Sequence, residues 1–247
     1  TKRSVLLENI KIVEKAVPLK TPVQSIDGIL LEADNSLTFT ANNLEMSIKA
    51  ADFTSRIEEN GRVLLPFNFI DVLKQLPEEN VEIKMEKDSF VTEIHCGKAK
   101  IFLYGINAGE FPKLTSEEQW TGWNCLEFSA TKLKNILKKI IFAVSRDEGN
   151  PIFRGILIEL DESGLLSFIS SDTYRMARFQ IRLSGERKAG PFRLLISGKS
   201  MNELYKIIED SDEILKCYFS EREMIFTYKH FVISVRLLEN NYPDLNH

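Results

Sequence analysis

Apolar and polar residues alternate along most of this 247-residue chain, and a period of two is typical of half-buried β-strands. Residues 81–85 and 231–235 are clear examples. Residues 34–35 and 162–164 separate pairs of such runs with turn-forming residues, which predicts hairpins. We therefore expect many antiparallel strands joined by short turns.

Four segments instead have apolar residues at the spacing of a helix with one buried face. The predicted helices cover residues 10–17, 70–76, 133–144 and 201–208. Pro18 and Pro77 follow the first two and predict where they end. Ser197 or Ser200 is expected to cap the last helix, because a serine hydroxyl accepts a hydrogen bond from a free backbone N–H there.

The chain also repeats itself with a period of about 130 residues, which is too long for a solenoid and suits a duplicated domain. Residues 28–32, 37–39 and 111–114 return as residues 155–159, 166–168 and 242–245. Each repeat reads helix, strands, helix, strands, which predicts an α+β unit with two helices on one face of antiparallel sheet. We place the two domains at 1–117 and 127–247, with a polar linker at 118–126.

Composition indicates a soluble globular protein, with 43% apolar and 28% charged residues. The net charge of −4 gives no overall basic surface for nucleic acid, although a local one is still possible. Three scattered cysteines argue against a disulfide framework or a zinc site, so we expect reduced thiols, a cytoplasmic protein and no cofactor. No apolar run has the length that a membrane span needs, and the chain starts without Met or a signal-peptide core.

The polar faces of the predicted helices are rich in lysine. Lys11 and Lys15 are four residues apart, as are Lys134 and Lys138. Most charge runs are simply solvated helix faces, and the glutamates among these lysines favour that interpretation. The alternative is a lining that neutralises phosphates without reading bases. The duplication favours this alternative, because equivalent helices would present their lysines to a common centre.

Catalytic motifs are scarce. His95 and His230 lie in or beside alternating segments and are expected on strands, and His247 is terminal. We find no nucleophile elbow, phosphate-binding glycine loop or paired-histidine metal motif. Residues 147–148 are expected to form a turn. The loop at residues 171–175 is the one segment that suggests an active site.

Five segments resemble the bacterial sliding clamp family, the beta subunit of DNA polymerase III. Residues 20–29 are similar to its segment after the first helix, and residues 42–46 to its D-L-E strand. Residues 171–177 resemble its T-D-x-x-R-L-A motif, and residues 108–112 and 242–244 its two domain-ending turns. The order and spacing of these matches extend across essentially the whole chain.

The resemblance implies duplicated DNA-clamp domains and a non-catalytic processivity factor. In this family two protomers of three domains form a ring, with helices lining the hole through which double-stranded DNA passes. Polymerase, clamp loader and repair proteins would bind through short extended peptides with apolar anchors, and no membrane is involved. The residues expected to face DNA are Lys11, Lys15, Lys20, Lys74, Lys134, Lys138, Lys139, Lys199 and Lys206.

The family pattern also assigns a partner groove and a protomer interface. The groove positions are Phe153, Ser171, Thr173, Arg175, Met176 and Pro243. Ordinary core packing is the alternative for Phe153 and Met176, although methionine adapts well to varied apolar anchors. Ile101 and Leu103 match the strand that meets a neighbouring protomer, where pairing would cover an exposed sheet edge.

Several features depart from the family. Asn43 stands where Asp is usual, Asn150 where Arg is usual, and Gln24 where Pro is usual. The family's third domain is absent from this chain, so we expect a monomer or weak oligomer of the 247 residues. Two other hypotheses stay open: a duplicated α+β peptide-binding module that never encircles DNA, and an enzyme that uses the loop at 171–175.

Overall fold

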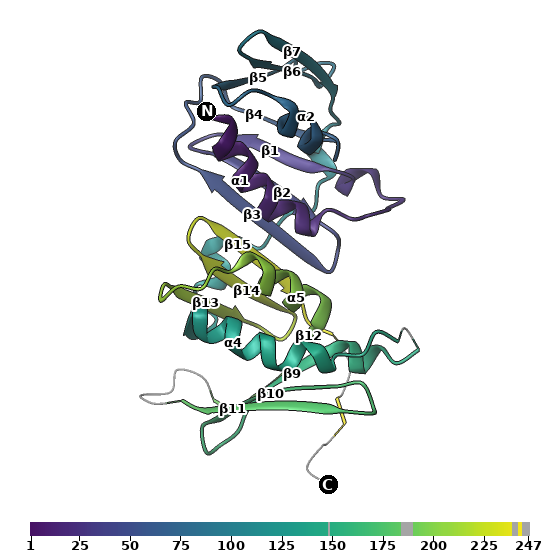
Figure 1. Ribbon diagram of the computed structural model, residues 1–247, viewed down its shortest axis with the longest axis vertical. Helices are drawn as coiled ribbons and strands as arrows, with labels where there is room; N and C mark the ends of the chain where they lie inside the picture. The colour runs from purple at the N-terminus through teal and green to yellow at the C-terminus, as the bar shows by residue number, and fades with distance from the viewer. Residues whose placement is uncertain (148, 184–189, 239–241, 244–247) are drawn as a thin grey trace. The chain divides into compact units, whose positions relative to one another are not determined.

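The computed structural model describes residues 1–147, 149–183, 190–238 and 242–243. The chain divides into two compact units (Figure 1). The first contains Thr1–Leu114 and His230–Val232, and the second contains Thr115–Lys229 and Ile233–His247. Each unit combines antiparallel sheets with amphipathic helices, as the sequence predicts for an α+β protein.

The first unit is built from helices α1 and α2 and two sheets. Its elements are α1 (Arg3–Val13), β1 (Ile29–Ala33), β2 (Leu37–Asn42), β3 (Met46–Asp52), β4 (Gly61–Leu65), α2 (Phe69–Gln75), β5 (Val81–Met85), β6 (Val91–Cys96) and β7 (Ala99–Tyr104). The sheets run in the orders β4-β1-β2-β3 and β5-β6-β7. Helix α1 packs on β2 and β3 with Leu6, Ile10 and Val13 fully buried.

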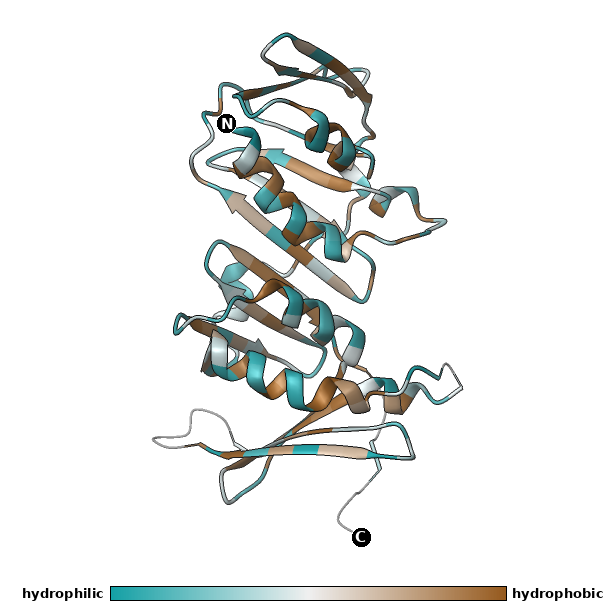
Figure 2. Cartoon of the chain, viewed as in Figure 1, coloured by the Kyte–Doolittle hydropathy of each residue, from teal (hydrophilic) through white to brown (hydrophobic). Residues whose placement is uncertain are grey.

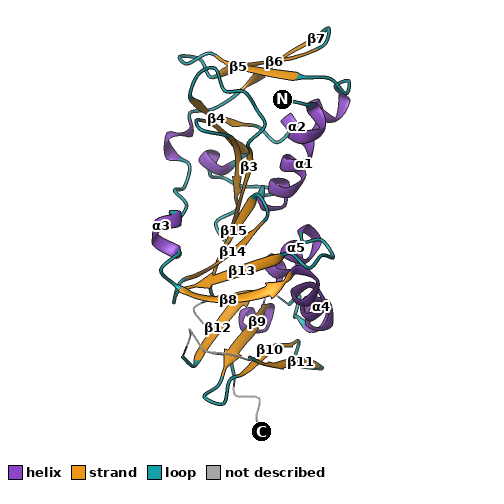
Figure 3. Ribbon diagram, turned by 90° about the vertical axis from the view of Figure 1, so that its left-hand side faces the viewer, coloured by secondary structure: helices purple, strands orange, loops and turns teal. Residues whose placement is uncertain are grey.

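The second unit repeats this plan. Its elements are β8 (Asn124–Ser129), α4 (Ala130–Ile140), β9 (Gly155–Leu160), β10 (Leu165–Ser171), β11 (Met176–Arg182), β12 (Phe192–Ser197), α5 (Gly198–Ile207), β13 (Ile214–Phe219), β14 (Glu223–Tyr228) and β15 (Phe231–Arg236). The sheets run in the orders β11-β10-β9-β12 and β15-β14-β13-β8. Helices α4 and α5 lie beside each other on one side of these sheets (Figure 3).

The four predicted helices form, and those at 70–76 and 201–208 end within one residue of the expected position. Ser197 is the N-cap of α5: its hydroxyl accepts a hydrogen bond from the Ser200 backbone N–H. The segments at 10–17 and 133–144 stop being α-helical earlier than predicted. In each case the last turn tightens to a 3-10 helix, Glu14–Ala16 and Ile141–Ala143, before the chain becomes extended. Both predicted hairpins join antiparallel strands.

The segment predicted to be a polar linker, 118–126, has regular structure of its own. It contains most of a short helix, α3 (Glu117–Trp120), and the start of β8. The Gln119 side chain accepts a hydrogen bond from the Ser116 N–H at the start of α3. Trp120 is buried, with its ring 4.8 Å from the ring of Tyr218. Tertiary packing of one tryptophan therefore orders a stretch that its polar composition suggests is loose.

The repeated glycines mark a close approach between strands. Gly28 has φ +156°, and a Cβ there would lie 2.1 Å from the Leu65 carbonyl oxygen. At its counterpart Gly155, a Cβ would lie 2.6 Å from the Leu195 side chain. Any larger residue would push apart the pairs β1–β4 and β9–β12, so the duplicated glycine is explained by sheet packing.

We predict that Gly28→Ala lowers the free energy of unfolding by about 1–3 kcal/mol or more, because the new methyl group meets backbone that cannot move aside. Urea denaturation followed by circular dichroism measures the change. Gly122→Ala is the control, since its Cβ would approach nothing closer than 3.9 Å. Equal stability of the two variants would contradict this account of the repeat.

Candidate functional site

Helix α4 carries its lysines around a buried apolar face. Leu133, Ile136 and Ile140 are buried against the sheets, which leaves Lys138 and Lys139 exposed. Bands of hydrophilic and hydrophobic residues alternate along α4 and α5 in Figure 2, as in a helix with one apolar face. Lys132, which the sequence reasoning omitted, is also exposed on this helix. Its place in the same Lys-rich run was the available signal.

Neighbouring side chains hold several of these lysines. The Lys134 ammonium lies 3.4 Å from an Asp210 carboxylate oxygen and over the Tyr205 ring of α5. Lys139 lies over the Phe179 ring of β11, 4.8 Å from its centroid. Of the two lysines of α5, Lys206 pairs with a glutamate of its own helix at 2.7 Å and Lys199 is exposed.

The lysines of the first unit show the same mixture. Lys15 pairs with Glu14 at 3.1 Å, and Lys74 lies 3.7 Å from Asp71. Lys11 is exposed on α1, whereas Lys20 is exposed on the loop after it and not on a helix. Within the described part of the chain, Lys11, Lys20, Lys138 and Lys199 have no ion-pair partner. The structure thus places eight of the nine predicted lysines on helices or the turn that ends α1.

The turn between β10 and β11 is closed by its own polar groups. The Ser171 hydroxyl donates to the Arg175 carbonyl oxygen at 3.1 Å and accepts from the Thr173 N–H at 3.2 Å. Thr173 adopts the left-handed conformation, with φ +74°. Partial burial raises the pKa of Asp172, but hydrogen bonds from the Arg175 backbone and side chain outweigh it and lower the pKa overall. These contacts give the loop a fixed shape.

This turn presents exposed apolar groups to solvent. Tyr174 is 96% exposed and Met176 is 50% exposed. The Arg175 guanidinium lies over the ring of Phe142, itself exposed, at 5.6 Å. Sequence reasoning omitted Tyr174 and Phe142. Tyr174 stands inside the quoted motif, so an aromatic side chain at a turn apex was the missed signal.

Phe153 and Tyr242 form an aromatic pair at the same end of the unit. Their ring centroids are 5.7 Å apart in an edge-to-face arrangement. Tyr242 is 3% exposed and packs with Leu157, Ile169 and Leu195, and Phe153 packs against this cluster. Core packing, the alternative stated for Phe153, is therefore part of its role. Pro243 is exposed beside the pair, and its sequence neighbours 244–247 lie outside the described residues.

The Tyr242 hydroxyl is buried without a hydrogen bond of good geometry. Burial raises the pKa of Tyr242 to about 12, and the nearby Ser171 backbone N–H offsets only part of that rise. This proximity joins the aromatic pair to the β10–β11 turn. The six predicted groove residues thus come from the turn, the start of β11, the 3-10 helix Pro151–Arg154 and the 242–243 segment.

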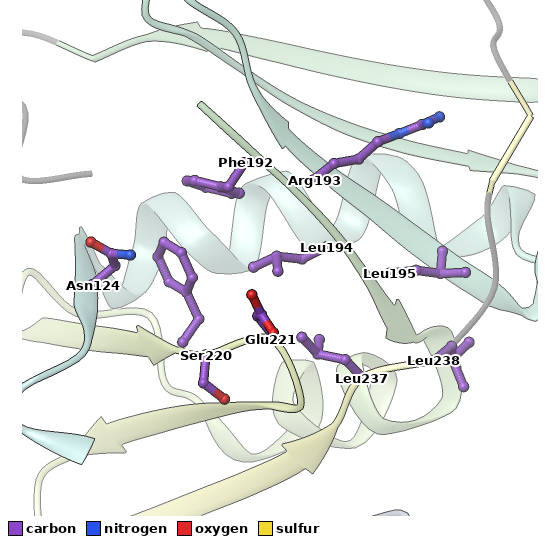
Figure 4. Close-up of a pocket in the computed structure, with 10 residues that line it drawn as sticks. Asn124, Phe192, Arg193, Leu194, Leu195, Ser220, Glu221, Leu237 and Leu238 are labelled. Atoms are coloured by element: carbon purple, nitrogen blue, oxygen red, sulfur yellow. The ribbon is translucent and has the colours of Figure 1, made fainter. Parts of the chain in front are cut away.

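A pocket of about 410 Å³ lies along β12, between it, the β13–β14 turn and residues 237–238 (Figure 4). Phe192, Leu194 and Phe219 line it, together with Ser220 and Glu221 of the turn. None of the six predicted groove residues lines this pocket. Leu195 and Leu238 line the pocket and also belong to the cluster around Tyr242, so the pocket and the cluster are neighbours.

Strand β7, which we predicted to meet a neighbouring protomer, exposes residues other than Ile101 and Leu103. Leu103 is only 6% exposed and Ile101 is partly buried, because alternate positions of β7 face the interior. The outward positions are occupied by Phe102 and Tyr104, with Lys100 over the Phe102 ring. The period of two in the sequence showed that Ile101 and Leu103 lie on one face of the strand and Phe102 and Tyr104 on the other. It did not show which face is buried.

Comparison with known proteins shows which family has this arrangement of domains. The family model for the DNA polymerase III beta subunit, N-terminal domain, matches residues 1–115, and the model for its central domain matches residues 127–244. The chain belongs to the DNA polymerase III beta subunit family. The two matched domains of this family follow the same order as the two units of the structure.

Relatives of this family align with nearly the whole chain. The beta sliding clamps of Halalkalibacterium halodurans and Bacillus subtilis are each 30% identical, over 98% and 97% of the chain. The crystal structure of the Bacillus subtilis sliding clamp superposes with a TM-score of 0.92 at 29% identity, covering 99% of this chain. The beta subunit from Streptococcus pyogenes gives 0.90 at 26% identity. The chain spans about 65% of the length of these clamps.

Two departures from the clamp family have visible consequences. Asn43, where the family usually has Asp, accepts hydrogen bonds from the Glu45 and Met46 N–H groups, so its amide oxygen supplies the acceptor that a carboxylate would. Asn150 donates to the Asp147 carboxylate at 3.2 Å in the expected turn, whose other residue, Glu148, lies outside the described residues.

The positions of the histidines agree only in part with the sequence prediction. His95 is on β6 as expected, in contact with Glu93, but His230 lies in the β14–β15 turn and not on a strand, and His247 lies outside the described residues. Among the described residues, no His, Cys, Asp and Glu side chains gather in a way that could hold a metal. Nor, in that part of the chain, is any helix long and apolar enough to cross a membrane.

We predict that Tyr242→Phe is neutral or stabilising by about 1–2 kcal/mol at pH 7, because it removes a buried hydroxyl without a good partner. Thermal and urea unfolding measure the change. The first repeat already has Phe111 at this position. The control is Tyr228→Phe, which loses the 2.8 Å hydrogen bond with Ser211 and should cost about 0.5–1.5 kcal/mol.

The same variant tests a pH dependence. The pKa of Tyr242 is about 12 in the folded protein and about 10 in an unfolded chain. The folded state therefore keeps the proton longer, and its stability, complete below pH 10, falls as the pH rises from 10 to 12. We expect the wild type to lose about 2–3 kcal/mol relative to Tyr242→Phe over this range. Parallel stability curves for the two proteins would show that Tyr242 is not the group involved.

Proposed function

We propose that this chain forms the first two domains of a sliding clamp, a processivity factor that encircles duplex DNA and tethers the replicative polymerase. The observation that carries the proposal is one α+β unit built twice, with lysine-bearing helices on one side of its sheets. Family membership supports it. Such a protein has no catalytic activity of its own. It keeps a polymerase near its primer at high effective concentration.

The nine lysines are the proposed DNA-facing residues. Lysine charges neutralise phosphates without reading the base sequence, which suits a protein that slides. Lys11, Lys20, Lys138 and Lys199 are available without breaking an ion pair. The pairs made by Lys134 and Lys206 are partly exposed, and exposed pairs contribute only about 0–1 kcal/mol. Phosphate can therefore replace these carboxylates at little cost.

The partner groove is proposed at the β10–β11 turn. Polymerase, clamp loader and repair proteins would each insert a short extended peptide with apolar anchors. Met176 and Tyr174 supply exposed apolar surface, and we assign a wall of the groove to Phe153, which packs on Tyr242, and to the exposed Pro243. Ring closure between protomers is proposed through β7, by way of Phe102 and Tyr104 as well as Ile101. We also propose that the protein works in the cytoplasm as a homodimeric ring at its full length.

Charge reversal of Lys134, Lys138 and Lys139 to Glu tests the DNA-facing surface. We expect loading of the full-length protein by its own clamp loader onto nicked circular DNA to fall by about tenfold or more, because three phosphate contacts become repulsive. Gel filtration of the loaded DNA, before and after the circle is linearised, measures loading and topological retention. Wild-type protein should be lost when the circle is cut.

The matched control reverses Lys87, Lys98 and Lys216, which are exposed and lie outside the helices. Its net charge changes by the same amount, and we expect it to load normally. Equal loss in both variants would indicate a general charge effect. Normal loading of the helix variant would contradict the proposed DNA face, and wild-type retention on linear DNA would favour a module that binds without encircling.

A further inference from the structure

The two units contain the same Glu–Arg pair at the same place. Glu32 on β1 is the register neighbour of Arg62 on β4, and Glu159 on β9 is the register neighbour of Arg193 on β12. In both pairs the arginine Nε lies 3.8 Å from a glutamate Oε1. Because the same atoms lie at the same distance in both units, we infer that this ion pair is a feature of the duplicated fold.

Each arginine extends past its glutamate to the chain segment that ends its unit. The Arg62 guanidinium donates to the Ala108 carbonyl oxygen at 2.6 Å. The Arg193 guanidinium donates to the carbonyl oxygens of Tyr242 at 2.8 Å and Pro243 at 3.3 Å. A planar guanidinium presents several N–H donors at fixed angles, so one side chain can hold an acid and a backbone segment together.

The held segments also share an aromatic anchor. Phe111 packs with Leu30 and Leu64 in the first unit. Tyr242 packs with their counterparts Leu157 and Leu195 in the second. The arginine thus fixes backbone next to a ring that the core already holds. In the first unit this arrangement anchors the segment around Ala108 and Phe111.

In the second unit the same arrangement carries proposed groove residues. Arg193 holds Tyr242, which contacts Phe153, and Pro243, which is exposed. Upstream, the Leu238 N–H donates to the Leu195 carbonyl oxygen, so β12 contacts the departing chain at two places. Figure 4 shows the Arg193 and Leu194 side chains pointing in different directions from β12. The Arg193 guanidinium reaches the 242–243 segment.

We propose that Arg193, oriented by Glu159, is a positioning residue for partner binding: it fixes the Tyr242–Pro243 backbone, so that this wall of the groove is formed before a peptide arrives. The inference rests on the proposed partner groove. A wall that is ordered in advance binds more tightly, because binding does not have to order it. Arg193 itself need not touch the peptide.

The test compares Arg193→Ala with Arg62→Ala in the full chain. The probe is a fluorescein-labelled synthetic peptide with Leu and Phe as apolar anchors, and fluorescence polarisation measures its Kd. Each variant removes a Glu–Arg pair and the hydrogen bonding from that arginine to the segment that ends its unit. Both should therefore lower the melting temperature. We expect Arg193→Ala to weaken peptide binding by about tenfold, mainly through faster dissociation, and Arg62→Ala to change it less than twofold.

Arg193→Lys keeps the positive charge but loses the planar guanidinium with its several N–H donors. We expect this variant to bind the peptide with an intermediate Kd. It also serves as the test if Arg193→Ala fails to fold. Equal Kd values for the Arg193 and Arg62 variants, with the wild type binding normally, would overturn the positioning role and leave the groove standing. No binding by the folded wild type would instead reject the groove itself.

Discussion

Burial of one apolar helix face against antiparallel sheet is the constraint on which the rest of the structure depends. Leu133, Ile136, Leu137 and Ile140 of α4 are each at most 1% exposed, and Leu6, Ile10 and Val13 of α1 are equally buried. Each such side chain contributes about 1.5–3 kcal/mol, several times the value of an exposed ion pair. The apolar stripe therefore fixes the rotation of the helix, and the lysines between its members must point outward.

That hierarchy explains what the sequence could predict. Period-two runs, helical stripes and the repeat are local patterns, and each is dominated by burial, so the α+β plan followed directly. Contacts between distant elements were out of reach. Asp210 is 76 residues from Lys134, and nothing near either residue indicates their pairing. Likewise, alternation in β7 separates Ile101 and Leu103 from Phe102 and Tyr104, but only the packed fold says that Leu103 is inside.

The residues of the candidate site were predicted mainly from the family resemblance, and only to a small extent from residue patterns. Its polar members are used locally, since Ser171, Asp172 and Thr173 close the turn that presents Tyr174 and Met176. A loop whose hydrogen bonds are satisfied internally is a rigid support, and that property is poorly suited to a nucleophile but well suited to a fixed binding wall. The hypothesis of an enzyme at residues 171–175 loses its main chemical argument for this reason.

The duplication also separates structure from function within one molecule. Where both units have the same arrangement, as with Gly28 and Gly155 or Arg62 and Arg193, the shared role is to hold each unit's fold together. Where they differ, the second unit shows what was added. Phe111 has no polar group on its ring. Tyr242 carries a buried hydroxyl beside the Ser171 backbone. A polar atom that costs stability at a packing position shared by both units is better explained by the proposed groove beside it than by the core beneath it.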